Sequence, residues 1–176
     1  MPQVNNFTIT VATANGSGSQ SSNSIIARTL FRMGIPVGAK NLFPSNIAGL
    51  PTWFSIRANE DGFTARKKLA DIVVAMNPAT GAEDLKLARP GGFVFVNNEI
   101  KILNPRTDVS LVPVPFREIV QPVSDSVKMR KLLINMVYVG LLAALLQIQQ
   151  NYPDEAVHNQ FRQKAAADIN LKAIAA

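Results

Sequence analysis

The sequence predicts an α/β protein: a single three-layer domain with a mainly parallel β-sheet and a helical C-terminal third. Three observations predict this class. Apolar strand-like segments alternate with helical patterns over the first two thirds of the chain. Two of these segments, 70–76 and 93–96, are nearly unbroken apolar runs, as in strands buried on both faces of a parallel sheet. From about Ser126 onward the pattern is helical.

The composition is that of a globular protein. Of 176 residues, 47% are hydrophobic and 17% are charged, which is enough apolar material for a core and too little charge for a disordered chain. The chain has no cysteine, so it forms no disulfide and cannot ligate an iron–sulfur cluster alone. Residues 1–6 lack the features of a secretory signal, and we therefore expect a cytoplasmic location.

The most informative segment is a turn of small residues between the first strand and the first helical pattern. The strand begins at Phe7, and the helical spacing of apolar residues begins at Ile25. A strand, a tight turn and a helix N-terminus together form a Rossmann-like phosphate site, because unpaired N–H groups and the helix dipole face the anion. The candidate anion-binding residues are Gly16, Ser17, Gly18, Ser19, Gln20 and Ser21.

This turn departs from the dinucleotide-binding pattern G-x-G-x-x-G. Ser21 stands where the third glycine is expected. Lys40 and Asn41 occupy the region in which an acidic residue would hold a ribose hydroxyl. These departures argue against a nicotinamide dinucleotide. Two interpretations remain: a phosphate site, or a serine-rich turn that only caps the helix.

The segment after the first helix is predicted to be extended. Gly34 ends the helix, and a loop over Leu42–Pro51 is unusually apolar. This loop either packs over the core or lines a site or a subunit contact. The alternation in Thr52–Arg57 predicts a strand, which would be an antiparallel insertion in the sheet, and a turn follows at 60–62.

The remaining strands and helices follow from capping and proline signals. Asn77 is predicted to cap a short helix that begins at Pro78 and continues to about Leu87. Segment 109–114 is predicted to be an edge strand, because Pro113 and the following Pro115 cannot donate to a ladder.

The C-terminal third is predicted to contain two helices. The first, from Ser126 to Gln149, is apolar on all sides, and burial on all sides would need a partner subunit as well as this chain's own sheet. Asn135 interrupts its apolar run, which favours a buried helix over a membrane span. Tyr152–Asp154 separates it from a final amphipathic helix, whose apolar residues are Val157, Phe161, Ala165 and Ile169.

The chain offers little catalytic chemistry of its own. The single histidine, His158, is predicted to lie on the surface, and the serines of the turn have no adjacent base. We therefore predict neither a catalytic residue nor a metal ligand. The basic clusters at 66–68 and 128–131 lack interleaved aromatics, which favours a solvated surface over nucleic-acid binding; a docking face for an acidic partner or an anionic cofactor is the alternative.

Several strings resemble the gamma subunit, or gamma domain, of 2-oxoacid:ferredoxin oxidoreductases, above all the gamma domain fused to alpha in 2-oxoglutarate-type enzymes. The resemblance covers nearly the whole chain and identifies residues 1–176 as one gamma-type domain. The strings that carry it are Ala14–Ser21, Leu30–Gly38, Lys40–Ile47, Gly49–Trp53, Ala75–Pro78 and Val137–Gly140. Many gamma subunits carry G-x-G-G-Q-G, and here Ser19 and Ser21 replace two of its glycines.

The resemblance implies an accessory role in the oxidative decarboxylation of a 2-oxoacid, such as 2-oxoglutarate, to an acyl-CoA. It implies a coenzyme A contact at the turn and at Lys40, Asn41 and Asn46. Thiamine diphosphate, Mg and iron–sulfur clusters are expected in the alpha and beta parts, with ferredoxin as electron acceptor. No membrane or nucleic-acid partner is expected. The alternative function is a non-catalytic nucleotide- or phosphate-binding module.

Overall fold

The computed structural model describes residues 5–43 and 47–176, which form two compact units. The first, called here the sheet unit, holds the described residues up to Gly16 and those from Ile35 to Pro115. The second, called here the helical unit, holds Ser17–Gly34 and Phe116–Ala176.

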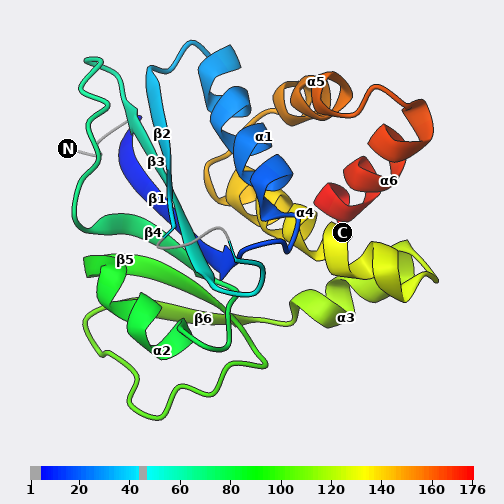
Figure 1. Cartoon of the computed structure of the whole chain (residues 1–176). Coiled ribbons are helices and arrows are strands. Elements are labelled where there is room, and N and C mark those ends of the chain that lie inside the picture. Colours follow the sequence, from blue (N-terminus) through cyan, green and yellow to red (C-terminus); the bar gives the residue numbers. More distant parts are fainter. Residues whose placement is uncertain (1–4, 44–46) are drawn as a thin grey trace. The chain divides into compact units, whose positions relative to one another are not determined.

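The sheet unit contains one six-stranded sheet in the order β2-β3-β1-β4-β5-β6 (Figure 1). The strand bounds are β1 (Asn6–Ala14), β2 (Val37–Leu42), β3 (Pro51–Asn59), β4 (Ala70–Ala75), β5 (Ala88–Asn97) and β6 (Ser110–Val114). Pairs β1–β4, β4–β5 and β5–β6 are parallel, whereas β3 is antiparallel to β1 and to β2. The predicted α/β class is confirmed, as are the mainly parallel sheet, the antiparallel insertion and the edge position of β6.

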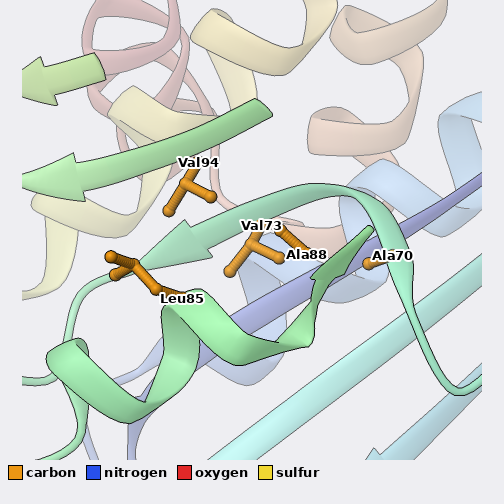
Figure 2. Close-up of a cluster of buried hydrophobic side chains, with 5 residues drawn as sticks. All are labelled: Ala70, Val73, Leu85, Ala88 and Val94. Atoms are coloured by element: carbon orange, nitrogen blue, oxygen red, sulfur yellow. The ribbon is translucent and has the colours of Figure 1, made fainter. Parts of the chain in front are cut away.

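One buried apolar cluster of the sheet unit lies between β4, β5 and the short helical segment that links them. Figure 2 shows Val73 of β4 and Val94 of β5 beside Leu85, all of them almost fully buried. Leu85 belongs to the 3-10 helix η1 (Leu85–Leu87), which directly follows α2 (Gly81–Asp84). Burial of these branched side chains removes apolar area from water and fixes the position of the linking segment against the sheet.

The start of α2 differs from the prediction. The helix begins at Gly81 rather than at Pro78. The Asn77 side chain instead accepts a hydrogen bond from the Ala79 N–H at 3.0 Å, and the Thr80 N–H donates to the Asn77 carbonyl at 3.2 Å. Asn77 therefore forms a local turn, a conformation that competes with helix capping in short polar residues.

Residues 89–92 follow the predicted helix end near Leu87 and include residue types common in turns, yet they belong to β5. The β4–β5 register pairs Ala70 with Ala88 and then Ile72 with Phe93, so an irregularity accommodates the extra residues. Gly91 has φ +74°, a left-handed conformation that glycine adopts readily. Pro90, Gly91 and Gly92 are residue types common in turns, but here they lie in a strand with an irregular register.

The helical unit contains α1 (Ser19–Arg32), α3 (Phe116–Val120), α4 (Val127–Leu145), α5 (Asn151–Gln160) and α6 (Lys164–Ala175), with the 3-10 helix η2 (Gln121–Val123) after α3 (Figure 1). Helix α4 packs against α1, α3 and α6, and α1 also packs against α5. The helical C-terminal third is confirmed.

Helix α4 is shorter than predicted and is not buried on all sides. It is capped by the Ser126 hydroxyl, and it ends at Leu145 because Gln147 adopts a left-handed φ of +53°. The N–H groups of Gln147 and Ile148 then donate to the Ala144 and Ala143 carbonyls, which closes the helix end. Its centre is buried, whereas its first turns are exposed.

The final helix of the prediction is two helices. Segment Tyr152–Asp154 lies inside the first turn of α5 instead of preceding the helix, which a proline tolerates there. The chain breaks at Phe161, which is extended, and α6 follows. None of the helices in the described part of the chain combines the length and the hydropathy that a bilayer crossing needs.

Candidate functional site at the glycine turn

The turn between β1 and α1 contains two glycines in the left-handed region. Gly16 has φ +82° and Gly18 has φ +84°, so residues with a side chain are disfavoured at both positions. Ser19 and Ser21 lie inside α1, where φ is negative. The two serines that stand at glycine positions of the pattern G-x-G-G-Q-G therefore cause no backbone strain.

No acidic side chain in the first turn of α1 offsets the positive end of the helix dipole. Gly18 stands at the N-cap position and makes no side-chain cap, and the first turn of α1 holds no acidic residue in the described chain. The turn is therefore compatible with an anion, because the first N–H groups of a helix have no partner within the helix and the dipole favours negative charge. Ser19 is buried, whereas Gln20 is exposed.

Helix α4 supports the turn within the helical unit. The Asn135 side-chain amide donates to the Ser17 carbonyl at 2.8 Å and also approaches the Leu132 carbonyl at 3.3 Å. A Cβ on Gly18 would lie 2.9 Å from Leu132 Cδ2. In the sequence, Asn135 is visible only as an isolated polar residue in an apolar run, which indicates a buried hydrogen bond without identifying its partner.

A buried polar pair joins α1 to α4 below the turn. The Tyr138 hydroxyl donates to Asn23 Oδ1 at 2.9 Å, and the Ser22 hydroxyl approaches the Met136 sulfur at 3.6 Å. Tyr138 is fully buried, and this burial raises the pKa of its hydroxyl. Tyr138 thus stays neutral and acts as a fixed support of α1.

Within the sheet unit, Asn15, which directly follows β1, forms hydrogen bonds with the apolar loop between β2 and β3. The Asn15 N–H donates to the Leu50 carbonyl and the Gly49 N–H donates to the Asn15 carbonyl, both at 2.8 Å. The Asn15 side chain donates to the Ile47 carbonyl at 3.2 Å. The described apolar residues of this loop do not pack over the core, because Ile47 is 66% exposed and Phe43 is 52% exposed. Its role in a site or a subunit contact stays a prediction.

The other predicted site residues lie on or after β2. Lys40 and Asn41 are exposed on this edge strand. Asn46 lies outside the described residues. Lys40 and Asn41 belong to the sheet unit, whereas Ser17–Ser21 belong to the helical unit, so a common site for all of them remains a prediction.

A buried carboxylate supports the end of the apolar loop, and sequence reasoning missed it. Trp53, near the start of β3, donates its indole N–H to Asp84 at 2.7 Å, and the Thr80 hydroxyl donates to the same carboxylate at 2.8 Å. Asp84 is 1% exposed, and burial raises its pKa more strongly than the two hydrogen bonds lower it. Asp84 thus anchors Trp53 to α2.

His158 and most residues of the two basic clusters lie at the surface. His158 is exposed, as predicted, and residues 66–68 are exposed as well. In α4, Lys128 and Lys131 are exposed, and Arg130 donates to the Ser124 carbonyl at 2.7 Å. Among residues 5–43 and 47–176, no three His, Asp or Glu side chains gather as metal ligands would.

A family model for pyruvate ferredoxin/flavodoxin oxidoreductase matches residues 8–176. The structure is similar to a 2-oxoglutarate:ferredoxin oxidoreductase from Magnetococcus marinus, solved with 2-oxoglutarate, coenzyme A and succinyl-CoA bound. The TM-score is 0.83 at 23% identity, over 97% of this chain. This chain spans 30% of the length of that protein.

Two smaller proteins match over most of their own length. Pyruvate oxidoreductase subunit PORC from Thermotoga maritima has a TM-score of 0.74 at 17% identity, covering 97% of this chain and 93% of that one. The gamma subunit of a keto/oxoacid ferredoxin oxidoreductase from Geobacter sulfurreducens also has a TM-score of 0.74 at 17% identity, covering 96% and 94%. No curated protein matches. At these identities the structural matches establish the fold.

Proposed function

Because the chain belongs to the pyruvate ferredoxin/flavodoxin oxidoreductase family, we propose that it serves as the gamma component of a 2-oxoacid:ferredoxin oxidoreductase. In this role it supplies a surface that binds coenzyme A and contacts the alpha and beta parts. The observation that carries the proposal is the turn before α1, where two left-handed glycines precede a helix N-terminus with no acidic residue in its first turn.

The residues at the turn fit the phosphate groups of coenzyme A. Backbone N–H groups of Gly16, Ser17, Gly18, Ser19 and Gln20 are the candidate donors, and Ser21 adds a hydroxyl. The Asn135 contact to the Ser17 carbonyl fixes the peptide before Gly18 and so limits the rearrangement that binding would require. Lys40, Asn41 and Asn46 are candidate contacts from the sheet unit. Coenzyme A accepts the acyl group in the reaction of the complex.

The reactive groups of the proposed reaction belong to other parts of the complex. The chain has no cysteine for an iron–sulfur cluster. Thiamine diphosphate, Mg and the clusters are therefore assigned to the alpha and beta parts, with ferredoxin as acceptor. The exposed apolar residues Phe43, Ile47 and Leu50 would contact those parts. The resemblance favours 2-oxoglutarate as the 2-oxoacid.

The first experiment is an affinity pull-down from native extract, followed by an assay of dye reduction that depends on a 2-oxoacid and coenzyme A. We expect recovery of thiamine-diphosphate-binding and iron–sulfur partners together with this activity. A panel of 2-oxoacids would then identify the substrate. Recovery of the chain alone, without activity, would contradict the proposal.

A matched pair of variants tests the turn. Gly18→Val and Gly34→Val both place a branched side chain at a left-handed position, with φ +84° and +81°, at opposite ends of α1. We expect Gly18→Val to lower turnover of the assembled enzyme at least about tenfold, whereas Gly34→Val retains it. Equal turnover and unchanged coenzyme A affinity in both variants would exclude the turn as the binding site.

The second candidate function is a non-catalytic nucleotide- or phosphate-binding module, which the same turn geometry supports. Thermal unfolding of the isolated chain separates the two. Stabilisation by coenzyme A favours the gamma role, and stabilisation by ATP or NAD but not by coenzyme A favours the module.

A further inference from the structure

The helical unit contains a cavity of about 210 Å³ that begins where the glycine turn ends. Gly18 and Ser21 contribute one wall. Most of the remaining lining is apolar and comes from α4 and α6, with Met129, Met136, Phe161 and Ile169 among its residues. An apolar lining of this kind suits neither a phosphate nor a metal ion, because burying a charge there without a partner is costly.

One polar side chain of the cavity, that of Asn170, has an acceptor atom that no described residue uses. Asn170 is 8% exposed and lines the cavity from α6. Its side-chain N–H donates to the Ala166 carbonyl at 2.7 Å, but its Oδ1 accepts no hydrogen bond from any residue that the structure describes. Oδ1 is not one of the buried side-chain atoms that lack a partner, so it keeps contact with solvent. A ligand in the cavity can therefore supply a donor in place of water.

The volume of the cavity limits the size of the ligand that it can hold. A dry apolar cavity of about 150 Å³ binds benzene. At about 210 Å³, the present cavity has room for a somewhat larger ring system. The methionines and the phenylalanine in its lining provide polarizable contacts that favour an aromatic guest.

We propose that this cavity binds a small aromatic molecule that carries one N–H or O–H donor, which the molecule gives to Asn170 Oδ1. The site borders the proposed phosphate contact at Gly18 and Ser21 but differs from it in chemistry, because its ligand contacts mainly apolar side chains of α4 and α6 and not the backbone N–H groups of the turn. It therefore requires neither coenzyme A nor the alpha and beta parts.

Indole and indene form a matched pair of probes, since they have nearly the same shape and only indole has an N–H donor. Binding to the full chain is measured by ¹H–¹⁵N correlation spectra and by thermal unfolding. We expect indole to shift the amide signals of Gly18, Ser21 and Asn170 and to bind about three- to tenfold more tightly than indene. Asn170→Leu should reduce this preference to about twofold or less.

A filled cavity supplies the second test. Ala166→Leu places three more carbons in the cavity and should abolish indole binding, whereas Ala165→Leu, an exposed neighbour on the same helix, should leave it unchanged. Ile169→Phe fills the same cavity from another position and should also abolish indole binding. It replaces Ala166→Leu as the test if that variant does not fold. Equal affinity for indole and indene, no indole binding at all, or binding that survives both filling variants would overturn the proposal.

Discussion

The side-chain amide of Asn135 donates to the main-chain carbonyl of Ser17 at 2.8 Å, so a residue in the middle of α4 fixes the peptide that precedes the N-cap of α1. Asn135 is 2% exposed. Its buried amide therefore stabilises a backbone turn that lies 118 residues away in sequence.

Asn135→Leu keeps the branching and the number of heavy atoms of the side chain but removes this donor. We expect a loss of about 1–3 kcal/mol in the free energy of unfolding, because the Ser17 carbonyl loses its partner in a part-buried place. Chemical denaturation measures the loss. Asn159→Leu is the matched control, since the exposed Asn159 amide also donates to a backbone carbonyl, that of Glu155, but within its own helix. Equal losses in the two variants would show that the Asn135 contact has no special role.

Gly18→Ala and Gly34→Ala should destabilise the protein by similar amounts, about 1–2 kcal/mol each, because both residues are left-handed. A Cβ at Gly34 meets nothing within 4 Å, whereas one at Gly18 meets the end of the Leu132 side chain. Leu132 is 45% exposed and can rotate away, so its contact adds little. Urea denaturation of both variants is the measurement, and a loss at Gly18 that exceeds the other by more than about 2 kcal/mol would refute this reasoning.

The sequence was sufficient for the order and type of most strands and helices. Apolar runs without interruption, such as 70–76, identified the central strands, and Pro113 identified the edge strand β6. The errors lie where a local signal has two structural outcomes. Asn77 caps a turn instead of a helix, and Gly91, a residue type common in turns, lies in the irregular part of β5.

The candidate site was predictable only in its backbone part. Gly16 and Gly18 are required by their torsion angles, and glycine is visible in a sequence. The supporting contacts were not predictable, because Asn135 reaches Ser17, and Trp53 reaches Asp84, only after the chain has folded. A polar residue within an apolar run signals a buried partner without identifying it.

Asp84 should make the stability of the protein depend on pH in an unusual direction. Burial raises its pKa in the folded protein above the ordinary value of 3.8, with a smaller contribution from Glu83 of the same sign. The folded state therefore binds a proton more readily than the unfolded state. Asp84 costs no stability at a pH below the ordinary pKa, and it destabilises the protein as the pH rises past the raised pKa.

Asp84→Asn keeps a carbonyl to accept from Trp53 and an amide to donate to Thr80, and it removes the buried charge. We expect this variant to be at least as stable as the native chain at pH 7, with an advantage that shrinks as the pH falls toward 4. Asp108→Asn should show the opposite sign, because the Arg106 hydrogen bond lowers the pKa of Asp108. Denaturation curves at several pH values test both, and the same slope in the two variants would contradict the assignment.

For Gly140→Ala, helix propensity and packing predict opposite changes in the stability of the protein. Gly140 lies within α4, where replacing glycine by alanine ordinarily stabilises a helix by about 1 kcal/mol. A Cβ at this position, however, would lie 1.9 Å from the Ile174 carbonyl oxygen and 2.9 Å from its carbon, both backbone atoms of α6. A backbone cannot rotate aside as a side chain does, so α6 must move.

We therefore expect Gly140→Ala to lower the free energy of unfolding by about 1–3 kcal/mol, the usual cost of overpacking. The loss should be local, because Ile174 lies in the last turn of α6 and that turn can separate from α4. Hydrogen exchange should consequently accelerate at the amides of residues 170–175 more than at those of α1. Ala144→Val, an exposed change on the same helix, should stay within about 0.5 kcal/mol of the native value. A more stable Gly140→Ala variant would mean that α6 does not approach α4 this closely in solution, and that helix propensity alone decides the outcome.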